Sequence, residues 1–191
     1  MVGIDTRIVI VGLPQVSQQL KANIEQAIWI TQVYVLTNTL TLSIIGRLGD
    51  IFGRVKIYTY GFALFTVGSA LTSLGTNPLE VIIFRGVQGV GAALVFTNSI
   101  TIATDSAPRN QLGLFLGINQ IAFRAGALLG LTLSGLILSF LDWRALFYIN
   151  IPIGIFGTIW AHRSLKETAL LDTDRHIDWG VSLFFLASCS A

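Results

Sequence analysis

The 191-residue sequence has few of the residues on which soluble enzymes and metalloproteins depend. Aspartate, glutamate, lysine and arginine make up 12% of the chain, against about a quarter in a typical soluble domain. There is a single cysteine, Cys189, so a disulfide within these residues is excluded. The two histidines, His162 and His176, lie well apart in the chain and neither has a cysteine close by, so a metal site is not expected there. We therefore expect no metal and no other cofactor.

Patterns of catalytic residues and targeting signals are also missing. No Ser/His/Asp set, Cys/His pair or carboxylate dyad occurs in a supporting context, so we do not expect an enzyme. RGVQGVG at 85–91 resembles a glycine-rich nucleotide turn, but it lies inside an apolar run rather than after a strand. The N-terminal segment MVGIDTRIVIV lacks the basic region and cleavage site of a secretory signal. The net charge of +2 comes with dispersed basic residues, so nucleic acid is not an expected partner.

Apolar residues dominate what is there. Hydrophobic residues make up 53% of the chain, the mean hydropathy is +0.72, and uncharged runs of around twenty residues recur. This pattern predicts an all-α fold, a polytopic bundle of transmembrane helices in a lipid bilayer. The complete runs predict helices at 28–45, 57–74, 81–104, 112–140 and 147–161.

The first and seventh predicted helices are incomplete. The first apolar run, 8–16, gives roughly 13 Å of helix against a hydrocarbon core of roughly 30 Å. The seventh run starts at Asp178 and reaches the last residue, Ala191. We expect a six-helix bundle at 1–163, a cytoplasmic connection at 164–177 and the start of a helix at 178–191. The chain is then either a fragment lacking a C-terminal half or a half-length subunit that needs a second copy or partner.

Basic residues predict how the helices are oriented. The connections after the second, fourth and sixth helices hold the majority of them: Arg47, Arg54, Lys56, Arg109, Arg163, Lys166 and Arg175. The other connections hold only Lys21 and Arg144. By the positive-inside rule the segment 46–56 is cytoplasmic in a multi-pass protein of the plasma membrane. Trp29 and Trp143 then lie near the outer helix ends, where an interfacial aromatic belt is expected.

Four segments carry a family resemblance. GRLGDIFGRVK at 46–56 resembles the signature loop between helices 2 and 3 of the major facilitator superfamily, and RGVQGVGAA at 85–93 resembles its helix 4 motif. IDTRIVIVGLP at 4–14 and DWRALFYINIPIG at 142–154 are similar to segments of the fourteen-helix drug:proton antiporters. The resemblance covers essentially the whole chain. It implies the N-terminal half of a secondary transporter, built from two three-helix repeats, that exports small hydrophobic or cationic compounds in exchange for protons.

The sequence also departs from the family pattern. Ile51 stands where the signature loop usually has a basic residue, and Arg7 replaces a small polar residue. In the antiporter motif that begins at Gly117, the proline is Leu131 and one glycine is Ser134. Because that motif is associated with export, an importer of another small solute stays an alternative.

Asp5 and Arg85 are the candidates for proton coupling. An ionisable group at membrane depth costs about 2.5–3.5 kcal/mol on insertion scales, so it needs a partner, an aqueous cavity or a function. The resemblance links these two positions to proton movement. On that hypothesis Asp5 gains and loses the proton, and Arg85 favours the charged carboxylate in one conformation. A purely structural ion pair is the alternative.

The segment 46–56 is a candidate conformational latch, formed by Gly46, Asp50, Gly53, Arg54 and Lys56. The carboxylate of Asp50 would accept hydrogen bonds from a helix N-terminus and from Arg54, closing the cytoplasmic side in one state of alternating access. The alternative is that these charges only fix the topology.

Polar residues within the apolar runs are candidates for a substrate cavity: Tyr34, Asn38, Gln88, Gln120 and Arg124. Those of the second helix lie on one helical face and could instead form hydrogen bonds between helices. Arg124, about 18 Å from the start of its helix, cannot easily reach water. It could bind an anionic group or pair with a carboxylate such as Asp5.

Small residues spaced along two helices are predicted to pack against neighbouring helices. They are Gly89 on the fourth helix and Gly126, Gly130 and Gly135 on the fifth. Such residues let two backbones approach closely.

Overall fold

The computed structural model describes residues 1–165, without the side-chain surroundings of Ser43, Gly46, Arg47, Leu48, Asp50 and Arg109. The predicted seventh helix at 178–191 and nearly all of the predicted connection at 164–177 lie outside the described residues. The described part is all-helical, as predicted. Its elements are α1 (Val2–Gln19), α2 (Ile24–Phe52), α3 (Arg54–Leu74), α4 (Pro78–Ser106), the short 3-10 turn η1 (Arg109–Gln111), α5 (Leu112–Phe140), α6 (Arg144–Tyr148) and α7 (Asn150–Ser164).

Two of the long helices start at an asparagine whose side chain caps the helix. Asn23 opens α2 with a capping box, in which its side chain accepts from the backbone N–H of Gln26 at 2.7 Å while the Gln26 side chain accepts from the Asn23 N–H at 3.0 Å. Asn77 caps α4 and is followed by a proline in the first turn, a position where the missing N–H removes no helical hydrogen bond. The apolar runs predicted a break between the helices at 57–74 and 81–104, and the structure has this break at 75–77.

The segment 46–56 is helical on both sides of one glycine, whereas the sequence predicted an eleven-residue loop. Helix α2 runs on to Phe52 and α3 starts at Arg54. Only Gly53 interrupts them, at φ 95°, a conformation that residues with a Cβ seldom adopt. The predicted helices at 28–45 and 57–74 were shorter than α2 and α3, because each was taken to end where its apolar run ended. Charged residues stop an apolar run without stopping a helix.

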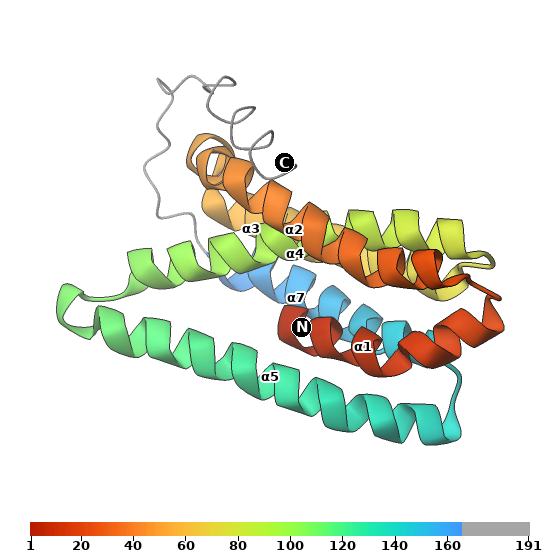
Figure 1. Cartoon of the computed structure of the whole chain (residues 1–191). Helices are drawn as coiled ribbons and strands as arrows, with labels where there is room; N and C mark the ends of the chain where they lie inside the picture. The colour runs from red at the N-terminus through yellow and green to blue at the C-terminus, as the bar shows by residue number, and fades with distance from the viewer. Residues whose placement is uncertain (166–191) are drawn as a thin grey trace.

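Each long helix packs closely against at least one other helix of the bundle. Helix α1 lies along α5, α2 lies along α4, and α3 contacts both α4 and α7. Figure 1 shows the connections that join α1 to α2, α3 to α4 and α5 to α6 at one end of the bundle, and the α2–α3 and α4–α5 connections at the other. Arg144 ties the first end together, since its guanidinium donates to the carbonyl of Gly75 at 3.2 Å.

Within the described residues, four helical segments are long and apolar enough to cross a membrane by length and composition: α3, α4, α5 and the continuous stretch Arg144–Ser164 formed by α6 and α7. Among these, α5 leaves the largest share of its residues exposed. Trp143 was predicted to face the membrane interface, but its side chain is fully buried within the bundle. Its indole N–H donates to Gln19 at 3.1 Å, and its ring meets Phe147 edge-on at 6.0 Å.

Candidate functional site

Five polar side chains from four helices meet in the interior. Asp5 comes from α1, Ser69 from α3, Arg85 and Gln88 from α4, and Asn150 from α7. All are at most 2% exposed. Arg85 and Gln88 are three residues apart on one face of α4, so both point at the same neighbours. We call these five residues the Asp5 network.

Asp5 accepts hydrogen bonds from three of these residues. One Oδ accepts from Arg85 Nη1 at 2.7 Å, and the other accepts from Gln88 Nε2 and Asn150 Nδ2, each at 2.9 Å. Ser69 Oγ accepts from Gln88 at 2.6 Å and from Asn150 at 3.3 Å. The buried carboxylate is therefore neutralised by one cation and held by two amides, as a buried charge requires.

The guanidinium of Arg85 is also held by groups outside the network. It lies over the ring of Tyr34 at 4.1 Å, in cation–π geometry. Its Nε donates to the carbonyl of Ile30 at 3.5 Å. Within the network, Nη1 also donates to Gln88 Oε1 at 2.7 Å. The contacts with Tyr34 and Ile30 join α2 to the Asp5 network.

A pocket of about 320 Å³ reaches the network between α1 and α2. Tyr34 and Arg85 form part of its wall, and Thr6, Thr31 and Gln32 give it polar groups. The hydroxyl of Tyr34 is buried and has no hydrogen-bond partner among the described residues. The lining is mainly apolar, and the pocket reaches the buried ion pair at Arg85.

A second pocket, of about 670 Å³, lies between α1 and α5. Its charged and amide side chains are Arg7, Gln120 and Arg124. We call it the Arg7–Arg124 groove. Of the five predicted cavity residues, the structure brings only Gln120 and Arg124 together. Tyr34 lines the pocket beside the Asp5 network, and Gln88 is fully buried as a member of that network. Asn38 is half-buried on α2 and lines neither pocket.

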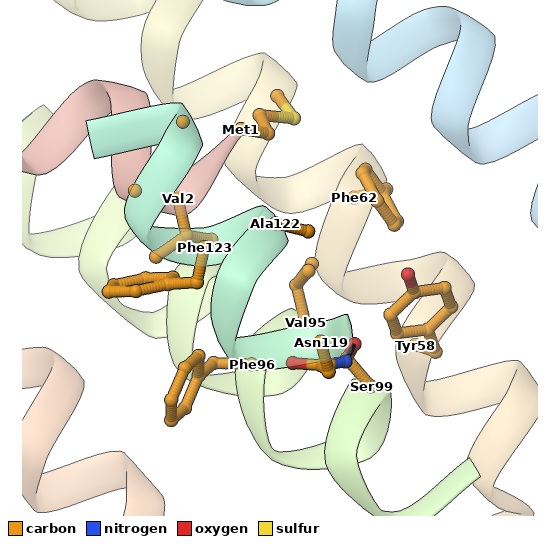
Figure 2. Close-up of a pocket in the computed structure, with 12 residues that line it drawn as sticks. Met1, Val2, Tyr58, Phe62, Val95, Phe96, Ser99, Asn119, Ala122 and Phe123 are labelled. Atoms are coloured by element: carbon orange, nitrogen blue, oxygen red, sulfur yellow. Dashed lines mark hydrogen bonds between the residues drawn. The ribbon is translucent and has the colours of Figure 1, made fainter. Parts of the chain in front are cut away.

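A third pocket, of about 260 Å³, lies between α3, α4 and α5 (Figure 2). Its polar groups are Tyr58, Ser99 and Asn119, and Asn119 Nδ2 donates to Ser99 Oγ at 2.8 Å. Phe96 and Phe123 meet edge-on at 5.4 Å on one side. These residues do not stand out in the sequence, because isolated Ser and Asn in an apolar run have no distinctive spacing.

The four glycines that were predicted to pack differ from one another. A Cβ built on Gly130 would lie 2.7 Å from the carbonyl oxygen of Ile4 on α1, and one on Gly89 would lie 2.6 Å from the carbonyl oxygen of Tyr34 on α2. Gly126 leaves more room, 3.5 Å to the Ile4 side chain. A Cβ on Gly135 would meet nothing within 4 Å in the described residues. Gly89 and Gly130 therefore occupy matching places in the α2–α4 and α1–α5 pairs.

The latch residues are only partly described. Arg54 forms an ion pair with Asp105, which ties the start of α3 to the last turn of α4. Gly53 is the break between the two helices, and Lys56 is exposed. The side-chain surroundings of Gly46 and Asp50 lie outside the described residues, so the predicted contact between Asp50 and Arg54 stays a prediction.

Sequence reasoning missed Ser69 and Asn150, although Asn150 lies in the segment DWRALFYINIPIG that carried part of the resemblance. A lone asparagine in an apolar run was the available signal, since such residues need a hydrogen-bond partner in the membrane. Nothing in the sequence said that this partner was Asp5.

Comparisons with known proteins agree with these observations. A family model described as the Major Facilitator Superfamily matches residues 1–186. The riboflavin transporter RibZ of Clostridioides difficile (strain 630) is 33% identical over 98% of this chain and 41% of its own. The multidrug transporter protein MdtP of Bacillus subtilis (strain 168) is 32% identical over 85% of this chain and 30% of its own. The tetracenomycin C resistance and export protein of Streptomyces glaucescens is 32% identical over 83% of this chain and 30% of its own.

A solved structure shares the fold. The crystal structure of a D-xylose-proton symporter matches with a TM-score of 0.70 at 19% identity, over 99% of this chain and 49% of that one. At this identity the match is evidence for the fold alone. The chain spans between 30% and 41% of the length of the three curated relatives.

Proposed function

The chain belongs to the Major Facilitator Superfamily, and on this premise we propose that it is the N-terminal half of a secondary transporter that exports small, largely apolar compounds in exchange for protons. The observation that carries the proposal is the fully buried ion pair of Asp5 and Arg85, 2.7 Å apart. Two relatives that match most of this chain are named for multidrug transport and for tetracenomycin C resistance and export.

Protonation of Asp5 would change what holds α1 to α4. In the charged state Asp5 neutralises Arg85. In the protonated state Arg85 keeps its cation–π contact with Tyr34 but loses its counter-charge. Removing one partner of a buried ion pair costs about 3–5 kcal/mol. One proton moving down roughly 200 mV supplies roughly 4.6 kcal/mol, which is of the same size as that cost.

Protons would reach Asp5 through the pocket between α1 and α2. Tyr34 and Thr6 line this pocket, and Thr6 also lines the Arg7–Arg124 groove on the other side of α1. Helix α1 therefore presents the proton site on its inner face and the groove on its outer face. A movement of α1 relative to α4 would change the groove as well, which is how protonation and substrate binding would be coupled.

The connection at 46–56 would face the cytoplasm of a cell whose plasma membrane holds the protein. At this end only Gly53 separates α2 from α3, and the ion pair between Arg54 and Asp105 joins α3 to α4. Asp50 would close the same end against the remainder of the transporter in one state of the cycle.

Proton coupling is tested with the product of the complete reading frame in proteoliposomes. We expect Asp5→Asn to abolish accumulation of a fluorescent apolar substrate driven by a pH gradient, while counterflow without a gradient continues. Glu25→Gln, which removes an exposed carboxylate at the start of α2, serves as the matched control. Gradient-driven accumulation that survives Asp5→Asn would remove the proton role. The direction of accumulation separates an exporter from an importer.

A further inference from the structure

The Arg7–Arg124 groove contains two guanidinium groups without a counter-charge. Both side chains are exposed, and neither forms a hydrogen bond or ion pair within residues 1–165. No aspartate or glutamate lines the groove. Arg124 lies about 18 Å from the start of α5 and roughly 24 Å from its end, near the middle of the span. A cation at that depth needs a partner.

We propose that the Arg7–Arg124 groove binds the acidic group of the transported compound, so that the substrates are apolar molecules carrying a carboxylate, sulfonate or phosphate. This inference rests on the proposed transport function and specifies its substrate class. A guanidinium is the side chain best suited to such oxyanions, because its N–H groups match their geometry in pairs.

The remaining wall of the groove suits an apolar body. Phe123, Ala127, Leu128 and Leu131 supply its carbon surface on α5, and Gln120 and Thr6 add uncharged hydrogen-bonding groups. Its volume of about 670 Å³ falls in the range of roughly 300–1,000 Å³ for drug-sized ligands. An aromatic acid could place its ring along these side chains while its acid group lies between the two arginines.

The charge of the groove also argues against a cationic substrate. Asp5 is the nearest acidic residue along α1, but it is fully buried against Arg85 on the inner face of the helix. A cationic compound would meet two like charges in the groove and no counter-charge, which disfavours binding. The sequence alone left cationic compounds open as substrates, because it did not place Arg7 and Arg124 in the same groove.

The test measures binding, so that it does not depend on proton coupling. The product of the complete reading frame is purified in detergent, and equilibrium dialysis gives its affinity for three matched probes: 2-naphthoate, 2-naphthamide and 2-naphthylmethylamine. We expect the carboxylate to bind about tenfold or more tightly than the amide, and the amine to bind weakest. Arg7→Gln and Arg124→Gln should each weaken carboxylate binding about tenfold to a hundredfold, the effect of one charge-assisted hydrogen bond, and leave the amide unchanged.

Three further variants separate charge recognition from folding. Arg7→Lys and Arg124→Lys keep the charge and should retain part of the carboxylate preference. Arg163→Gln removes an exposed arginine of α7 outside the groove and should change nothing. Equal affinity for the three probes, a preference for the amine, or an equal loss of all three probes in the Gln variants would overturn the proposal. The last result would instead indicate that the arginines pair with a carboxylate elsewhere in the protein.

The two proposals fail separately. If Asp5→Asn left gradient-driven transport intact while the carboxylate preference was present, proton coupling through Asp5 would be wrong and the groove assignment would stand. If Asp5→Asn abolished gradient-driven transport and no carboxylate preference was found, proton coupling through Asp5 would stand and the groove assignment would be wrong.

Discussion

Arg85 and Arg124 occupy opposite environments on two helices of the same bundle. Arg85 is 2% exposed and is held by Asp5, Gln88, the Ile30 carbonyl and the Tyr34 ring. Arg124 is exposed in a groove with no acidic wall. The folded chain gives the first arginine a counter-charge, two further acceptors and an aromatic ring, and it leaves the second without a partner in the described residues. The first therefore reports on stability and proton linkage, and the second on what binds from outside.

Arg85→Ala is expected to have the largest effect on the free energy of unfolding. This change leaves the Asp5 carboxylate buried with two amide donors but no cation, and we expect it to lower the free energy of unfolding by about 3–5 kcal/mol. Denaturant unfolding of the purified full-length protein in detergent measures the loss. The double variant Asp5→Asn with Arg85→Gln should recover a substantial part of it, because no buried charge remains. A loss below about 1 kcal/mol for Arg85→Ala would contradict the burial of the pair.

A smaller effect is expected from Ser69→Ala, which tests whether the Asp5 network works as a unit. Ser69 Oγ accepts from both Gln88 and Asn150, so its removal leaves two amide groups with one acceptor fewer each. We expect a loss of about 1–2 kcal/mol in unfolding free energy. Ser139→Ala is the matched control, since this exposed hydroxyl donates only to its own helix at Leu136. Equal effects in the two variants would argue against a cooperative network.

The smallest effect on stability is expected at the other arginine. Arg124→Gln removes a side chain that makes no contact with a partner group, so the unfolding free energy should change by no more than about 0.5 kcal/mol. The same denaturant measurement applies, with Arg85→Gln at the opposite extreme. A loss of 2 kcal/mol or more for Arg124→Gln would mean that the two arginines are both structural, and the contrast between them would disappear.

Several parts of the fold follow directly from local sequence. The predicted helix at 112–140 coincides with α5, because an apolar run between Pro108 and Asp142 has clear limits. The break before α4 was predictable from Asn77 and a following proline. The ends of α2 and α3 were not, because charge in 46–56 ended the apolar runs while the backbone stayed helical up to Gly53.

The candidate site was predictable only in part. Asp5 and Arg85 stand out in sequence, since ionisable residues in apolar runs are rare and need a reason. Ser69 and Asn150 do not stand out, because their role depends on α3 and α7 reaching the same point as α1 and α4. Trp143 shows the same limit. Its place near a helix end predicted a membrane interface, but packing of α1 against the α5–α6 connection buries it.

Low charge and long apolar runs were enough to assign the class of this protein, because they require transmembrane helices, whose backbone groups must be satisfied within each helix. The sequence also indicated which charges would matter. Tertiary structure decided which charges meet. Asp5 and Arg7 are two residues apart on α1, so they point to different sides of that helix. Only the packing of α4 on one side and α5 on the other paired Asp5 with Arg85 and placed Arg7 in the groove with Arg124.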